Sequence, residues 1–187
     1  EHYRYTRDEA WVRRVAPKLT LACRYLDQWR RRNRREDLRG RGYGMMEGKT
    51  ADPPDLFRSF MLNGYAALGM KRVAEMLEHV APEESRQWRA VSAELAADTR
   101  AALREAMGRS PVVPLASGEW TRTVGPWAEA RGPLALYTDG GSWYTHGSMV
   151  SRDSLLGPLY AVYQEVLDPR DPAAAALGVK GVVAGRD

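Results

Sequence analysis

Apolar side chains recur every three or four positions through most of the first 110 residues, which is the spacing of one face of an α-helix. The same period returns towards the end of the chain. Glycine and proline interrupt it at a few places and divide it into separate helices. The helices that this pattern predicts cover residues 6–37, 54–80, 83–107 and 151–168.

Local signals place the starts of two of these helices. Thr6 and Glu9 have the spacing of a capping box, so the first helix is expected to begin at Thr6. Pro17 lies inside that helix and is expected to kink or restart it, because proline removes a backbone donor. Asp52 followed by Pro53 is typical of an N-cap and a first turn, so the second helix is expected to begin there.

Only Ala81 and Pro82 separate the second helix from the third. A connection this short forces the two helices to run antiparallel, as a helical hairpin. The sequence therefore predicts an all-α fold built from antiparallel hairpins. One domain is expected over residues 5–170, followed by a frayed or truncated tail over 171–187.

The helical period disappears between residues 109 and 150, where short strands are predicted at 112–115 and 134–138. A stretch of this length without helix is more often functional than idle. Because the tight turn lies at one end of the helices and the long loops at the other, the loops are expected to share one face. Such arcs repeat in (α/α) toroids and solenoids.

The composition is that of a folded domain, because 44% of the residues are hydrophobic and 28% are charged. No run approaches the roughly 20 apolar residues of a membrane span, so no membrane association is expected. The first residues are charged and aromatic, unlike a secretory signal. The compartment stays open, with the cytoplasm slightly favoured.

Cysteine and histidine are too few to build a metal centre. Cys23 is the only cysteine, which excludes an internal disulfide, and its place among apolar helical positions predicts a small core residue. The histidines are scattered along the chain, and no phosphate loop or dinucleotide fingerprint is present. The sequence indicates no metal and no organic cofactor.

The net charge of +4 comes almost entirely from arginine. The densest run covers residues 30–35 at the end of a predicted helix, where the helix dipole favours cations. Glu36 and Asp37 follow it directly. A solvated helix end is the expectation and a phosphate-binding patch is the alternative. No nucleic-acid motif accompanies the run, so a nucleic-acid partner is not expected.

A glycine-rich loop just before the second helix carries the first set of candidate residues. Asp52 and Asp55 would be held ionised by the helix dipole, which suits a general base or a clamp on hydroxyl groups. Capping of the helix is the alternative role for both. Tyr43 and Arg58, at the two ends of this loop, are predicted to bind substrate.

The second set lies in the long loop between residues 119 and 147, where aromatic rings stand beside carboxylates. Rings suit the C–H faces of sugars, and a carboxylic acid beside tryptophan is pushed towards its protonated form, as a glycosidic general acid requires. Alternatively, the rings form a small core of the loop itself. The predicted catalytic carboxylates here are Glu129 and Asp139, and the predicted sugar platform consists of Trp127, Trp143, Tyr144 and His146.

Three runs carry a resemblance to a known family. They are Asp52-Pro-Pro-Asp55 with the helix after it, Ser110-Pro-Val-Val-Pro-Leu115, and Leu134-Ala-Leu-Tyr-Thr-Asp-Gly-Gly-Ser-Trp143-Tyr-Thr-His-Gly147 with Ser151-Arg-Asp-Ser-Leu-Leu-Gly-Pro158. The chain resembles bacterial six-hairpin glycosidase-like proteins over about residues 5–170. That resemblance implies an (α/α)6 toroid, a central cleft lined by long loops, and hydrolysis or a related reaction of carbohydrates.

One departure from that family is large. Six hairpins require twelve helices, and four are predicted here, so the chain is expected to be part of a longer one. The sequence thus predicts a carbohydrate-active, glycoside hydrolase-like protein, inverting rather than retaining, that acts through Asp52, Asp55, Glu129 or Asp139. The alternative is a non-catalytic helical-hairpin module that binds glycan or protein through its aromatic loop face.

Overall fold

The computed structural model of the chain describes residues 2–48, 57–114, 118–132, 157 and 159–176. It is mainly helical, which confirms the all-α prediction. The elements are α1 (His2–Thr6), α2 (Glu9–Arg31), the 3₁₀ helix η1 (Glu36–Leu38), α3 (Phe60–Leu77), α4 (Pro82–Arg109), β1 (Val112–Pro114), β2 (Trp120–Arg122), α6 (Tyr160–Tyr163) and α7 (Pro172–Ala176).

The long helix α2 starts later than predicted and is not interrupted. Its N-cap is Asp8, whose carboxylate accepts a hydrogen bond from the backbone N–H of Trp11 at 2.9 Å. Thr6 instead ends α1, and Arg7 turns the chain with a φ of 53°. Pro17 lies on the exposed side of α2, and the helix runs through it without the predicted restart.

Helix α3 also starts later than predicted. Ser59 is its N-cap, with the hydroxyl accepting from the backbone N–H of Leu62. The residues just before it are extended, because the backbone N–H of Phe60 donates to the Pro126 carbonyl. Phe57, an apolar residue shortly before α3, is 45% exposed. The predicted start at Asp52 and Pro53 lies outside the described residues.

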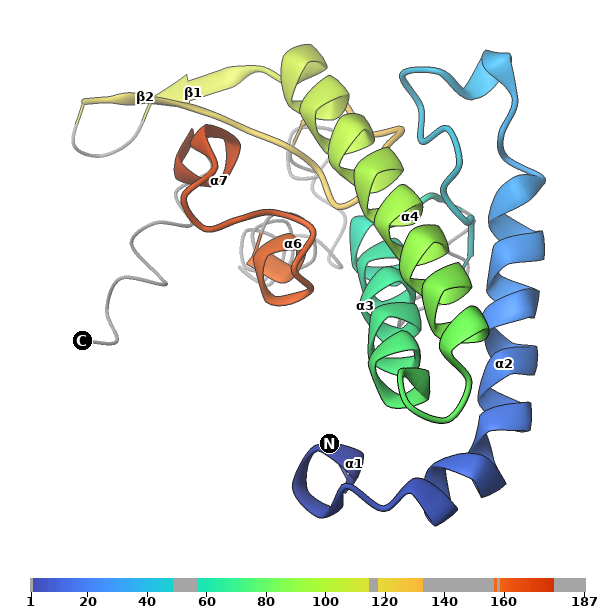
Figure 1. The fold of residues 1–187 in the computed structure, drawn as a ribbon. Helices are drawn as coiled ribbons and strands as arrows, with labels where there is room; N and C mark the ends of the chain where they lie inside the picture. Colours follow the sequence, from blue (N-terminus) through green and yellow to red (C-terminus); the bar gives the residue numbers. More distant parts are fainter. Residues whose placement is uncertain (1, 49–56, 115–117, 133–156, 158, 177–187) are drawn as a thin grey trace, which may run out of the picture.

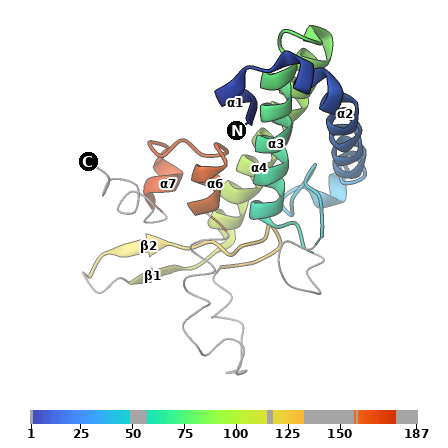
Figure 2. The same cartoon turned by 90° about the horizontal axis from the view of Figure 1, so that it is seen from below.

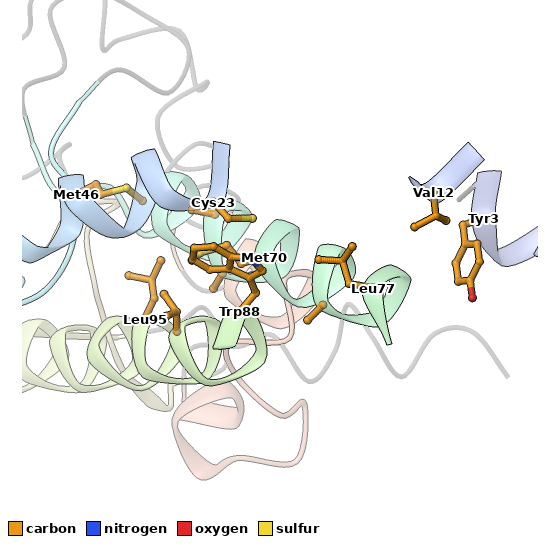
Figure 3. Packing of buried hydrophobic residues seen from close by; sticks show 12 residues of the cluster. Tyr3, Val12, Cys23, Met46, Met70, Leu77, Trp88 and Leu95 are labelled. Atoms are coloured by element: carbon orange, nitrogen blue, oxygen red, sulfur yellow. The ribbon is translucent and has the colours of Figure 1, made fainter. Parts of the chain in front are cut away.

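The predicted hairpin is confirmed by α3 and α4, which run antiparallel on either side of the turn at Ala81 (Figure 1). Pro82 is the first residue of α4, where a proline costs the helix nothing. Trp88 is buried between α2, α3 and α4 (Figure 3). Cys23 is 3% exposed in the same core, as predicted.

The second half of the chain packs on the other side of the hairpin. Helices α6 and α7 lie on the side of α3 and α4 that faces away from α2 (Figure 2). Strand β1 matches a predicted strand and pairs antiparallel with β2, with Val113 opposite Thr121. The strand predicted at 134–138 lies outside the described residues.

The helix predicted over 151–168 is described only as α6. It ends at Tyr163 because Glu165 takes a left-handed conformation with a φ of 60°. Its carboxylate is held there by Lys71 and Arg72 of α3. The tail predicted as frayed begins with α7, where the Asp171 carboxylate accepts from the backbone N–H of Ala173 at 2.8 Å.

The arginine run at the end of α2 is not simply a solvated helix end. The Arg30 side chain is fully buried and reaches the α4 carboxylates of Glu94 at 3.2 Å and Asp98 at 2.6 Å. Arg34 joins the same pair of acids. That part of the prediction was wrong, because α4 lies alongside α2 and supplies acids that no local pattern reveals. No described helix is long and apolar enough to cross a membrane.

Candidate functional site at the loop end

The described parts of the two predicted site loops meet at one end of the bundle, which we call the loop end (residues 42–48, 57–59 and 124–130). Ser59 and Trp127 form an isolated antiparallel β-bridge. Next to it, the backbone N–H of Ala128 donates to the Arg58 carbonyl at 3.0 Å. The turn at Ala81 lies at the opposite end of α3 (Figure 1).

An ion pair joins the same two loops. The Arg58 guanidinium donates to the Glu129 carboxylate at 2.7 Å, and the backbone N–H of Arg58 donates to that carboxylate as well. Only 14% of the Arg58 side chain and 24% of the Glu129 side chain are exposed. A charged, hydrogen-bonded pair of this kind fixes the register of the two segments more firmly than a surface pair does.

The network continues from Arg58 to a second carboxylate. Arg58 also donates to the side-chain oxygen of the buried Asn33 at 3.3 Å, and the Asn33 amide donates to Glu47. Burial alone would raise the pKa of Glu47. Hydrogen bonds from Asn33 and from its own backbone, the positive charge of Arg58 and a hydrogen bond from Trp29 together hold that pKa below its ordinary value. Glu47 is therefore a carboxylate kept ionised beside the loops.

A buried asparagine on α3 holds the segment that carries Glu47. The Asn63 side-chain oxygen accepts from the backbone N–H of Met46 at 2.7 Å, and its amide donates back to the Met46 carbonyl at 2.9 Å. The amide also donates to the Ser59 carbonyl. Met45 and Met46 are both fully buried. One side chain thus satisfies both backbone groups of a loop residue that would otherwise be buried without partners.

Aromatic rings lie beside the polar network. The Phe57 and Trp127 rings contact each other with centroids 4.8 Å apart. Tyr43 lies under the Arg39 guanidinium, which is 3.7 Å from its ring centroid, a cation–π geometry. The Trp29 ring packs against Gly48, where a side chain would collide with it. The loop end thus combines flat rings with ionised and amide groups.

Two glycines let the loops approach this closely. Gly42 has a φ of 91°, and a Cβ there would lie 2.7 Å from the Arg58 side chain. A Cβ on Gly125 would meet the Gly132 carbonyl at 2.6 Å. A side chain at residue 42 would therefore press on Arg58, and one at residue 125 would disturb the fold of the loop that carries Glu129.

The structure describes four of the ten predicted site residues. Arg58, Trp127 and Glu129 are in contact through the bridge and the ion pair, and Tyr43 follows Gly42, which touches Arg58. Asn33, Glu47 and Asn63 belong to the same network; the two asparagines were not predicted, and Glu47 lies in the glycine-rich candidate loop without a predicted role. For Glu47 its glycine-rich surroundings were the available signal, whereas nothing local marks the asparagines. The remaining predicted site residues, all outside the described ranges, are Asp52, Asp55, Asp139, Trp143, Tyr144 and His146.

Replacing Glu47 by glutamine tests whether this carboxylate is held ionised. Because its pKa is lower in the folded chain than the unfolded value of about 4.3, its ionisation stabilises the fold above that value, and the contribution is lost as the pH falls through the folded-state pKa. We expect the natural chain to lose more stability than Glu47→Gln between about pH 6 and pH 3. Urea unfolding at each pH measures the difference.

The matched control is Glu78→Gln, which removes a charge from a side chain that is 56% exposed. The free energy of unfolding of this variant is expected to depend on pH as that of the natural chain does. If the free energy of unfolding changed with pH equally in Glu47→Gln and in the natural chain, the hydrogen bonds of Glu47 would not favour its ionised form.

No protein-family model, curated protein or solved structure matches the chain. The resemblance to six-hairpin glycosidase-like proteins, with its closed toroid, therefore stays a prediction. Within the described ranges, no group of three or more histidine, cysteine or acidic side chains is arranged to hold a metal ion. Any functional conclusion therefore rests on the local geometry of the loop end.

Proposed function

We infer that the chain belongs to a carbohydrate-active protein that binds a glycan at its loop end. The observation that carries this proposal is the meeting of two loops there, with rings and ionised groups on both. Trp127 and Phe57 come from different loops and share one contact. The Arg58–Glu129 ion pair holds them in register.

The chemistry of sugars supports this assignment. A sugar ring presents C–H groups on its faces and hydroxyls at its edge, so it needs a flat apolar surface with hydrogen-bonding groups around it. Phe57 is 45% exposed and Trp127 is partly exposed, so both rings keep accessible surface. Glu47 supplies an acceptor that stays ionised at neutral pH.

The described carboxylates are better suited to positioning than to proton donation. Glu129 accepts two kinds of hydrogen bond from Arg58, and Glu47 is stabilised in its ionised form. We therefore assign the general-acid role of a glycoside hydrolase to the remaining predicted acids, Asp52, Asp55 or Asp139. Inversion would require an acid and a base about 6.5–9.5 Å apart.

Replacing Trp127 by alanine tests the glycan site. We expect the natural chain to bind at least one of a panel of soluble oligosaccharides covering α- and β-linked glucans, xylans and chitin fragments. Trp127→Ala should weaken that binding about tenfold or more, because stacking on one ring supplies on the order of 1–2 kcal/mol. Isothermal titration calorimetry measures the affinities.

The matched control is Trp120→Ala on β2, which removes a tryptophan that is 69% exposed and lies outside the loop end. It should leave the affinity unchanged. Equal losses in both variants, or no binding to any of these glycans, would contradict the proposal. Release of reducing ends from a bound oligosaccharide would assign a hydrolase, and binding without release would assign the non-catalytic module.

A further inference from the structure

The first half of α2 and the α3–α4 turn lie at the end of the helices opposite the loop end (Figure 1). Residues of these two segments line a groove. Its volume is about 490 Å³. Its lining is mostly carbon from apolar side chains and from the stems of longer ones. The residues that line it are Arg13, Ala16, Pro17, Thr20, Leu21 and Arg24 of α2, with Val80, Ala81 and Glu84 from the turn.

The α2 residues of this groove form one continuous helical face. They follow each other at intervals of three, one, three, one and three positions, which is the repeat of a single side of a helix. From Arg13 to Arg24 this face is about 16 Å long, or three helical turns. Leu21 stands on it with 63% of its surface exposed. The groove therefore has the length and the apolar character of a seat for a short helix.

The α2 side of the groove is basic. The segment from Arg13 to Arg24 contains Arg13, Arg14, Lys18 and Arg24 and no acidic residue. Arg13 reaches one exposed carboxylate, Glu9, at 3.3 Å. Lys18 and Arg24 have no ion-pair partner within the described part of the chain.

The single acid of the groove is already engaged. Glu84 accepts a hydrogen bond from the Thr20 hydroxyl at 2.6 Å. It therefore contributes to holding α2 against the turn, and its negative charge offsets only part of the positive charge that Arg13 and Arg24 bring to the groove. An apolar floor beside a predominantly basic helix selects a partner that is apolar on one side and acidic at the edges.

We propose that this groove binds an amphipathic helix of a partner protein, about three turns long, whose apolar side covers Leu21 and whose flanking acidic residues pair with Arg13 and Arg24. A second copy of the chain is disfavoured as the occupant, because a symmetric contact through this face would set the same cations against each other. A nucleic acid is disfavoured because the floor of the groove is apolar, so that phosphate groups could contact only the cations at its rim. The proposal does not depend on the glycan site.

Two designed peptides of about 12 residues test it, both helical with one leucine face and flanked by glutamate in the first and by lysine in the second. We expect the glutamate peptide to bind the full chain and the lysine peptide to bind at least about tenfold more weakly. Binding should also weaken several-fold between about 50 and 300 mM salt. Fluorescence anisotropy measures the affinities, and amide chemical shifts should move at residues 13–24 and 80–84.

Leu21→Glu is the most informative variant, because it introduces a negative charge into the groove that repels the glutamates of the first peptide. Leu21 is too exposed for this change to unfold α2. This substitution should lower the affinity for the glutamate peptide about tenfold or more. The control is Tyr163→Glu on α6, where an apolar side chain is 55% exposed away from the groove, and it should leave the affinity unchanged.

Three results would overturn the proposal. The first is that the glutamate peptide fails to bind up to millimolar concentration or binds Leu21→Glu equally well. The second is a dimer of the natural chain in sedimentation experiments that Leu21→Glu dissociates, which would assign the groove to a second copy. The third is binding of a duplex oligonucleotide that depends on Arg13 and Arg24 and not on Leu21.

Discussion

Replacing Arg30 by alanine is expected to lower the free energy of unfolding by about 3–5 kcal/mol. The side chain is fully buried, and it is the cation between α2 and the α4 carboxylates Glu94 and Asp98. Without it, Asp98, with 20% of its side chain exposed, would lie next to a second acid and be left with Arg34 at 3.7 Å. Removing one partner of a buried pair leaves a poorly compensated charge, which costs more than the pair contributes. Urea unfolding measures the loss.

Two further variants separate charge from volume and from surface effects. Arg30→Met keeps the apolar stem, so it should be nearly as destabilising as Arg30→Ala if the lost charge is the cause. Arg31→Ala removes a neighbouring arginine that is 64% exposed and pairs with Asp27 at 2.8 Å, and it should cost less than about 1 kcal/mol. A loss below about 1 kcal/mol for Arg30→Ala would contradict the view that Asp98 depends on it.

Replacing Asn63 by alanine is expected to cost about 2–5 kcal/mol and to release the loop that carries Glu47. The change leaves the backbone N–H and carbonyl of Met46 buried without their partners. Each unsatisfied buried group costs about 1–3 kcal/mol. Because Trp29 packs against Gly48 in the same loop, the tryptophan fluorescence, to which Trp29 contributes, should change at denaturant concentrations below the main unfolding transition.

The matched control for this prediction is Ser92→Ala. Ser92 is also buried on a helix, and its hydroxyl donates a single hydrogen bond to the Ala67 carbonyl at 2.7 Å, away from the loop end. It should cost about 1 kcal/mol and leave the fluorescence transition single. An early fluorescence change in both variants would show that the loop is released by general loss of stability and not by loss of Asn63.

The sequence predicts the helical hairpin accurately because the signals for it are local. Pro82 at the start of α4 and the short connection before it are visible within a few residues. The late starts of α2 and α3 show where local signals compete. Asp8 is a stronger N-cap than Thr6 for α2. Ser59 becomes the N-cap of α3 because the backbone N–H of its neighbour Phe60 donates to the carbonyl of Pro126, more than 60 residues away.

The candidate site could be predicted only in part, because its bonds join distant residues. The aromatic and acidic composition of the loops led to Trp127 and Glu129. No pattern pairs residue 58 with residue 129, or residue 33 with residue 47. The buried asparagines are ordinary polar residues in the sequence, and only packing shows that their amides complete the hydrogen bonds of the loops.

The single thiol of the chain lies in the core between α2 and the hairpin. Burial, and secondarily the negative charge of Glu84, raise the pKa of Cys23 to about 11. The thiolate is the reactive form towards oxidants and alkylating agents, so the closed molecule resists both. Chemical modification therefore requires α2 to separate from its neighbours, and the rate of modification reports how often the protein opens.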